Sequence, residues 1–207
     1  MKTSRAKKTS RPSRRPRIVL ASASPRRRDL LSEAGFEFEV EPSHTQEIAH
    51  EHFTVREIVL WNAKAKAEEV SRRRPDALVI GADTLVAIDG APLGKPRDLN
   101  DAHAMLRRLN GRAHEVFSGV WLSWGTRQQA LGFVQTSRVS FRELSEKEMR
   151  DYLRRIDPLD KAGAYAAQEE NDATRIIAKI DGSRTNVIGL PMEMLKKALR
   201  IFSAARA

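Results

Sequence analysis

Apolar positions along the chain follow two different periods, and the alternation between them predicts strands interleaved with helices. Short apolar runs and apolar-polar alternation are typical of strands. They occupy residues 17–21, 36–40, 77–88, 113–123, 130–141 and 174–180. Apolar positions three or four residues apart are typical of helices. They occupy residues 25–34, 55–71, 100–110, 145–155 and the segment that follows Pro191.

Local signals mark several boundaries between these elements. Asp89-Gly90 predicts a tight turn that reverses the chain direction into a hairpin. Asn100 is expected to cap the helix that follows it, and Ser145 with Glu148 has the spacing of a capping box. Because strands and helices are interleaved without a strict βαβ order, the predicted fold class is mixed α/β.

The positive charge of the chain is concentrated at its N-terminus. The net charge is +10, and eight of the 37 Lys and Arg residues but none of the 27 acidic residues lie among residues 1–17. The remainder therefore carries a net charge of only +2. We expect residues 1–17 to form a disordered basic tail and residues 18–207 to form the folded domain. A solvated extension is the preferred interpretation of the tail, although it could contact RNA or anionic surfaces, and no specific nucleic-acid partner is expected.

The remaining composition excludes several classes of protein. The 207 residues include no cysteine, so disulfide bonds and thiolate metal sites are excluded. No apolar run of about 18 residues is present, and the basic N-terminus is not followed by the apolar stretch of a signal peptide. We therefore expect a cytoplasmic protein with no membrane partner.

Candidate chemistry appears first at Ser22–Arg28, where Pro25 is expected at the first helical position. Basic side chains in the first turn of a helix oppose its dipole, and a bound phosphate chain would offset that cost. The alternative, an exposed basic helix start, is about equally compatible with this segment. Gly90–Lys95 does not match a phosphate-binding P-loop, because one residue is missing between the glycines and proline follows the lysine.

Two further segments place polar groups in unusual surroundings. Asp83 interrupts the apolar run Leu78–Val86, where a carboxylate must be paired, bound to a metal or exposed in a cleft. A structural hydrogen-bond acceptor remains the alternative. The segment Asp160–Tyr165 places small residues between an ion pair and an aromatic ring, and Gln168 follows it. Such a segment allows a ligand to approach the backbone closely, but a loop salt bridge is the alternative.

Taken together, the motifs resemble one known family in order and spacing. They are LASASPRRRDLL, VIGADTLV, LGKPRD, LRRLNGRAHEVFSGV, DKAGAYAAQ and NVIGLP. In these motifs, spread over residues 18–202, the chain resembles the Maf-type nucleotide pyrophosphatases, once described as septum-formation inhibitors. The resemblance implies an elongated mixed sheet flanked by helices, with two lobes and an active-site cleft between them. It also implies hydrolysis of a nucleoside triphosphate to a monophosphate and pyrophosphate, with a divalent metal cation, Mg or Mn. A homodimer is the assembly that the resemblance suggests.

The same resemblance implies roles for individual residues. Asp83 falls at the catalytic position, where it would activate or position the attacking water directly or through the metal. Glu47 is the second candidate metal ligand, because Ser43 and Gln46 stand where family carboxylates are common. The residues implied in binding the substrate are Ser24, Arg26, Arg27, Lys64, Thr84, Lys95, Lys161 and Gln168. His44, His50 and His52 are interpreted as surface histidines, because they form no HExxH pattern.

Three of these positions point to a substrate class within the family. Arg26, Thr84 and Gln168 are similar to the branch that acts on dTTP and UTP, and unlike the branch associated with 7-methyl-GTP. Gln168 offers both a donor and an acceptor, which the edge of uracil or thymine can match. One departure lies beside this position, since Glu169–Asp172 replaces the usual glycine-rich turn.

Two other functions compete with the enzyme hypothesis. A nucleic-acid-binding module would explain the basic tail but not the motifs around Asp83 and Asp160. A non-catalytic nucleotide-binding regulator of septum formation or cell division would fit the older family description. The regulator predicts no turnover, so a pyrophosphate-release assay separates it from the enzyme.

Overall fold

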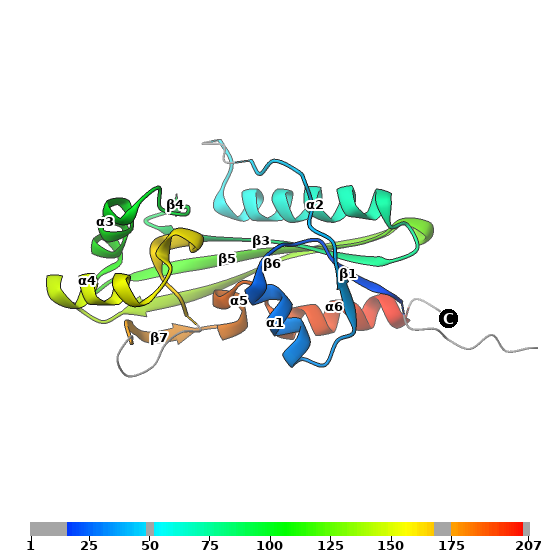
Figure 1. The fold of residues 1–207 in the computed structure, drawn as a ribbon. Coiled ribbons are helices and arrows are strands. Elements are labelled where there is room, and N and C mark those ends of the chain that lie inside the picture. Colours follow the sequence, from blue (N-terminus) through cyan, green and yellow to red (C-terminus); the bar gives the residue numbers. More distant parts are fainter. Residues whose placement is uncertain (1–15, 49–51, 168–174, 205–207) are drawn as a thin grey trace, which may run out of the picture.

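The fold is built on one twisted sheet with helices on both of its faces (Figure 1). It is known from a computed structural model, which describes residues 16–48, 52–167 and 175–204. The strands are β1 Ile18–Leu20, β2 Phe38–Val40, β3 Leu78–Ile88, β4 Ala91–Leu93, β5 Ala113–Trp124, β6 Gln129–Phe141 and β7 Ile177–Asp181. The helices are α1 Pro25–Glu33, α2 Val55–Arg73, α3 Leu99–Leu109, α4 Glu146–Arg155, α5 Arg184–Ile188 and α6 Met192–Ala204, with short 3-10 turns at Gly125–Arg127, Pro158–Asp160 and Ala162–Ala164.

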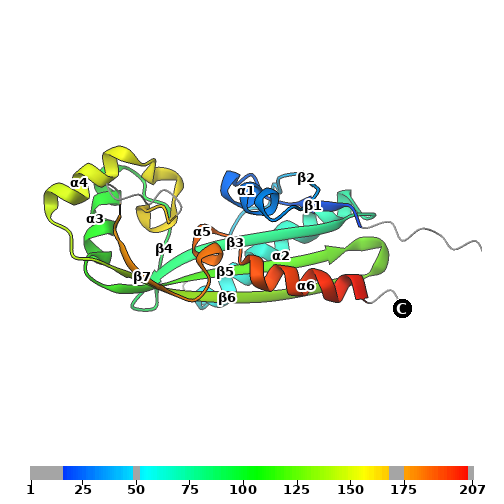
Figure 2. The ribbon, with the colours of Figure 1, turned by 90° about the horizontal axis from the view of Figure 1, so that it is seen from below.

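The sheet is mixed, as the sequence predicts. Its strand order is β2-β1-β3-β5-β6-β7, and β4 pairs with the end of β3. β1 runs parallel to β2 and β3, whereas all other pairs are antiparallel. The long strands β3, β5 and β6 extend along most of the molecule and give it an elongated shape (Figure 2). The predicted mixed α/β class is therefore confirmed.

Two of the three apolar cores lie at opposite ends of the long strands and define two lobes. In one lobe, α1 and α6 pack on the β1 end of the sheet through side chains that include Leu31, Ile80 and Leu195. In the other lobe, α3 and α4 pack on the opposite end of the long strands through Leu106, Met149 and their neighbours. This division agrees with the predicted two lobes.

Side-chain alternation along β3 decides which residues face α2. Successive side chains of a strand point to opposite faces of a sheet. Ile80 and Ala82 therefore join the core under α1 and α6, while Val79 joins the core under α2. Gly81 and Asp83 share the face of Val79, which directs the Asp83 carboxylate toward α2.

Two glycines allow α2 to lie almost directly on the sheet backbone. A Cβ atom at Gly81 would lie 2.2 Å from the carbonyl oxygen of Ala63, and one at Gly119 would lie 2.3 Å from that of Val59. Both distances are far below van der Waals contact, so no other residue fits without moving the helix. The alanines Ala63 and Ala67 complete this close contact from the helix side.

The structure corrects two predicted boundaries. The cap of α3 is Asp98 rather than Asn100, because the extended backbone of Asp98 lets its carboxylate accept the amide of Asp101 at 2.8 Å. The last predicted strand begins at Ile177 rather than at residue 174. The hairpin at Asp89-Gly90 and the Ser145 capping box are both present as predicted.

Most of the predicted basic tail, residues 1–15, lies outside the described residues. Among the helices that the structure describes, none combines the length and the apolar character needed to cross a membrane.

A buried histidine in the lobe of α3 and α4 makes stability sensitive to pH. His114 is 2% exposed, contacts the rings of Phe141 and Tyr165, and lies 3.0 Å through Nε2 from the Tyr165 hydroxyl. Burial lowers the pKa of His114 to about 4 from an ordinary 6.5. The folded protein therefore keeps this ring neutral in a pH range where the unfolded chain protonates it.

We expect the free energy of unfolding to fall as the pH drops from 7 toward 4, because only the unfolded state gains the proton. The contribution of His114 is up to ~3 kcal/mol, from ~1.4 kcal/mol per pKa unit. Denaturant unfolding at several pH values should show a shallower pH dependence for His114→Gln than for the wild type. The matched control is His44→Gln at an exposed position, which should keep the wild-type slope. An unchanged slope in His114→Gln would show that this ring is not the group responsible.

Candidate active site

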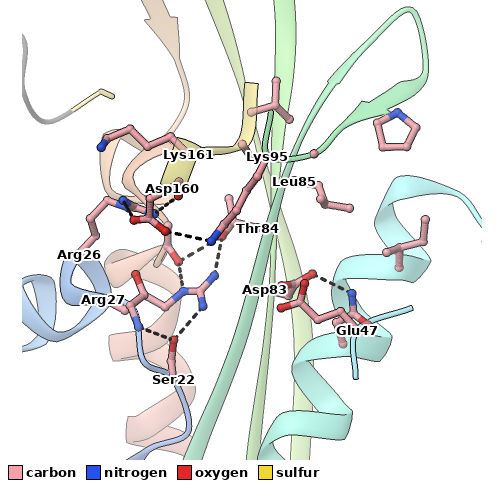
Figure 3. A pocket seen from close by; sticks show the side chains of 18 of the residues that line it. Ser22, Arg26, Arg27, Glu47, Asp83, Thr84, Leu85, Lys95, Asp160 and Lys161 are labelled. Carbon is pink, nitrogen blue, oxygen red and sulfur yellow. Dashed lines mark hydrogen bonds and ion pairs between the residues drawn. The ribbon is translucent and has the colours of Figure 1, made fainter. Parts of the chain in front are cut away.

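A cleft of about 1120 Å³ lies between the two lobes, and the sequence motifs converge on it (Figure 3). Its walls come from the loop and helix start at residues 21–27, the segment 42–48, one side of α2, the middle of β3, and the loops at 90–95, 160–167 and 187–189. These segments are far apart in sequence. The crossing of β3 between the two lobes brings them together.

Asp83 lies in this cleft with both carboxylate oxygens held by α2. Its Oδ1 accepts from Lys66 Nζ at 2.8 Å, and its Oδ2 accepts from Asn62 Nδ2 at 3.0 Å. Asn62 and Lys66 are one helical turn apart, so their side chains lie on the same side of α2. Asp83 is only 5% exposed, and the close packing of α2 on Gly81 places both donors within reach of it.

Lys66 joins two carboxylates at the rim of the cleft. Its ammonium lies 2.6 Å from Glu47 Oε1 and 2.8 Å from Asp83 Oδ1. The Lys66 side chain is 11% exposed, whereas the Glu47 side chain is 59% exposed. One positive charge thus serves two negative charges, and the cluster keeps a net negative charge that a cation could neutralise.

Thr84 faces the opposite side of β3 and belongs to a second polar network. Its hydroxyl lies 2.8 Å from Ser118 Oγ and 3.3 Å from the Gly189 carbonyl oxygen. The fully buried Ser118 donates in turn to the carbonyl of Asn186 at 3.1 Å. This network joins β3 and β5 to α5 and to the loop after it, so Thr84 is fixed beside the cleft.

Arg27 connects three segments on the side of the cleft that carries the basic residues. Its guanidinium donates to Ser22 Oγ at 3.0 Å, to Thr84 Oγ1 at 3.2 Å and to the Gly189 carbonyl at 3.0 Å. Burial lowers the pKa of Arg27, and the nearby carboxylate of Asp83 opposes that shift. The guanidinium remains charged, since arginine does not deprotonate in proteins. Arg27 therefore adds positive charge to the cleft from a position fixed by three segments.

Asp160 links the two lobes across the cleft mouth (Figure 3). Its carboxylate accepts from Lys95 Nζ at 2.9 Å and from Arg26 Nη1 at 3.0 Å. Lys95 and then Arg26 hold the pKa of Asp160 below its ordinary value, against the opposing effect of partial burial. Lys95 and Arg26 thus share one carboxylate as their acceptor, and a phosphate group could replace that carboxylate.

Comparison with known proteins matches this chain to one protein family. The family described as Maf-like protein matches residues 17–202. The chain belongs to this family. It is 45% identical to a dTTP/UTP pyrophosphatase of Akkermansia muciniphila, over 89% of this chain and 95% of that protein. It is 40% identical to a dTTP/UTP pyrophosphatase of Bacillus pumilus, over 89% of this chain and 96% of that one. Among solved structures, the Staphylococcus aureus Ham1 protein overlaps in part, with 16% identity, a TM-score of 0.45, and coverage of 60% of this chain and 71% of that one.

The cleft of this Maf-like protein brings together most of the residues singled out from sequence. Those that line it are Ser24, Arg26, Arg27, Glu47, Asp83, Thr84, Lys95 and Lys161. Lys161 is 7% exposed, and its Nζ donates to the carbonyl oxygen of Asp157 at 2.8 Å. Gln168 lies outside the described residues, as does His50. His44 and His52 are exposed, as predicted.

Lys64 is the one described candidate that does not line the cleft. Its ammonium lies over the ring of Trp121, 5.3 Å from the centroid, and 3.8 Å from Glu68 Oε1. The helical period explains the difference, because positions two residues apart on a helix point about 200° apart. Lys66 instead reaches Asp83.

Asn62 and Lys66 are not among the site residues predicted from the sequence, although a signal for them exists. Both border the small residues Ala63 and Ala67, at the same four-residue spacing. Alanines at this spacing indicate a helix face that lies against a sheet. Polar residues immediately before them then lie at the edge of that contact, where they can reach a strand residue.

The carboxylate oxygens available in the cleft fit a divalent cation that takes only one or two ligands from the protein. Asp83 and Glu47 supply carboxylate oxygens, and no group of three His, Cys, Asp or Glu residues that could hold a metal occurs among the described residues. Mg²⁺ commonly binds through one or two carboxylates, with substrate phosphates and water completing its shell. The Asp83-Glu47 pair matches that mode, whereas a site made of protein ligands alone is not supported in the described part of the chain.

Proposed function

We propose that this protein hydrolyses dTTP and UTP to the nucleoside monophosphate and pyrophosphate. The observation that carries the proposal is the buried Asp83 carboxylate, held by Lys66 and Asn62 in a cleft whose far wall presents Arg26 and Lys95. A positioned carboxylate facing a set of cations is the arrangement that phosphoryl transfer requires. The names of the curated relatives support the same activity.

In this proposal the triphosphate binds on the cationic side of the cleft. Arg26 and Lys95 exchange the Asp160 carboxylate for phosphate oxygens, and Lys161 lies on the same wall. Backbone amide groups in the first turn of α1, which follows Ser24, would provide further donors to a phosphate. Arg27 keeps this wall in place through its contacts with Ser22, Thr84 and Gly189, and adds charge without leaving them.

The reaction is an in-line attack of water on the α-phosphorus. The bond from that phosphorus to the bridging oxygen breaks, and pyrophosphate leaves with the bonding electrons. Asp83 orients the water and accepts its proton, which is general-base catalysis. Lys66 offsets part of the negative charge of Asp83 and Glu47, which reduces their repulsion of the anionic substrate.

A divalent cation, Mg or Mn, belongs to this proposal. Asp83 and Glu47 would hold it together with phosphate oxygens of the substrate. When bound, it would neutralise charge on the triphosphate and polarise its phosphoryl oxygens.

Base selectivity tests the substrate class. We expect dTTP and UTP to be hydrolysed about ten- to a hundred-fold more efficiently than ATP, GTP, CTP or 7-methyl-GTP. A misplaced donor or acceptor leaves a buried polar group unpaired, at a cost of about 1 to 3 kcal/mol. Gln168 is the proposed base-reading residue, and Gln168→Glu should reduce this preference more than it reduces stability. The measurement is kcat/KM by pyrophosphate release across the nucleotide panel.

The same panel separates the remaining possibilities. Equal rates for purine and pyrimidine triphosphates would refute the pyrimidine preference and leave the pyrophosphatase chemistry standing. Binding of nucleotides without turnover, in folded protein supplied with Mg²⁺ or Mn²⁺, would instead support a non-catalytic nucleotide-binding regulator.

A further inference from the structure

Asn62 lines the cleft and contacts Asp83, but the reaction outlined above gives it no step of its own. It is 3% exposed and lies on α2, one turn before Lys66. Its Nδ2 donates to Asp83 Oδ2 at 3.0 Å and to the carbonyl oxygen of Ile48 at 3.2 Å, while its Oδ1 accepts the amide of Ile48 at 2.9 Å. Both N–H groups of the amide and its carbonyl oxygen are therefore engaged.

These three hydrogen bonds connect two parts of the cleft that are separate in sequence. Asp83 lies in the middle of β3, whereas Ile48 directly follows Glu47 in the segment that forms the cleft rim. The two bonds with Ile48 resemble those between paired strands, because the backbone N–H of Ile48 donates to the Asn62 side chain and its carbonyl oxygen accepts from the same side chain. The third bond joins that pairing to Asp83, so the segment carrying Glu47 is fixed relative to the Asp83 carboxylate.

We propose that Asn62 is a positioning residue for the proposed hydrolysis: it orients the Asp83 carboxylate and holds Glu47 beside it. This inference rests on the proposed function of Asp83. Lys66 contacts both carboxylates through charge, but a flexible ammonium sets no single orientation. The planar amide of Asn62 supplies that orientation, since its two N–H groups diverge at a fixed angle toward Asp83 and Ile48.

The side chain at this position must be an amide of this length. Aspartate is isosteric, yet it lacks both donors and would place a second negative charge against Asp83. Leucine has a similar volume and makes none of the three hydrogen bonds. Glutamine is one methylene longer, so its amide would not lie where the Asn62 amide meets both Asp83 and Ile48.

The test compares Asn62→Leu and Asn62→Asp with the wild type in steady-state hydrolysis of dTTP and UTP with Mg²⁺. We expect kcat to fall about ten- to a hundred-fold, because a small misplacement of a reacting group has an effect of that size. KM should stay within about threefold, since the proposed phosphate contacts lie on the opposite wall of the cleft. A residue that only stabilised the fold would not produce this division between kcat and KM.

Val70→Ala provides the matched control for stability. Val70 is fully buried on the same helix, two turns from Asn62, and lies in the apolar core under α2. Truncation there should lower thermal stability while leaving kcat within about twofold of the wild type. Wild-type kcat in folded Asn62→Leu, or an equal loss of kcat in Val70→Ala, would overturn the proposal.

A second measurement works without any nucleotide. Hydrogen exchange of a peptide covering Ser43–Ile48 should become faster in Asn62→Leu but not in Val70→Ala, since only the first loses the contacts with Ile48. If the wild type hydrolyses no triphosphate, the proposed function fails by itself. Unchanged exchange in Asn62→Leu would then overturn the positioning role too, whereas faster exchange would support the hold on this segment.

Discussion

Asp83→Asn is expected to lower the turnover of dTTP and UTP at least ~100-fold while the fold is retained. The amide cannot accept the proton of the attacking water, and it brings no negative charge toward a metal cation. Its remaining oxygen can still accept a hydrogen bond from Asn62 or Lys66, and Lys66 keeps its ion pair with Glu47. Pyrophosphate release measures the effect, with circular dichroism and thermal unfolding as the check on folding.

Asp89→Asn is the matched control for this change. Asp89 lies on the same hairpin, six positions further along the chain, with its side chain 66% exposed and paired to Arg112. An exposed pair of this kind contributes at most ~1 kcal/mol, so the variant should keep nearly full activity. Full turnover in a folded Asp83→Asn protein would rule out Asp83 as the general base.

Lys66→Met is expected to produce the second large effect, a loss of kcat/KM of about 100-fold. Methionine approximates the volume of the lysine stem but leaves Asp83 and Glu47 without their shared cation. Their combined negative charge would then repel the triphosphate and disturb the arrangement of the general base. The measurement is kcat/KM for dTTP, with thermal unfolding recorded in parallel because an unpaired buried charge also destabilises the fold.

Lys64→Met gives a direct comparison on the same helix. Lys64 lies over Trp121 and near Glu68, on a different side of α2. Since these are contacts of a half-exposed side chain, the change should alter kcat/KM less than about threefold. Equal losses in the two variants would mean that the net charge of the helix, rather than the contact with Asp83, carries the effect.

The fold class and most element boundaries could be predicted from the sequence because the signals behind them are local. The hairpin at Asp89-Gly90 depends on two adjacent residues, and the capping box of α4 depends on Ser145 and Glu148 three positions apart. The sequence predicts Asn100 as the cap of α3, whereas the structure has Asp98 in that position. Both residue types cap helices well, and the extended backbone of Asp98 decides between them. The residue types alone do not reveal which backbone is extended.

The sequence by itself determined the mixed α/β class, the family and the motif positions of the candidate site, Asp83 above all. Only the tertiary structure decided which neighbours serve that site. It placed Lys66 and Asn62 at the Asp83 carboxylate, directed Lys64 away from it, and showed that Arg27 braces three segments. The physical reason is that these contacts depend on how α2 is rotated and how closely it lies on Gly81. That rotation is set by packing between segments distant in sequence, which no local pattern specifies.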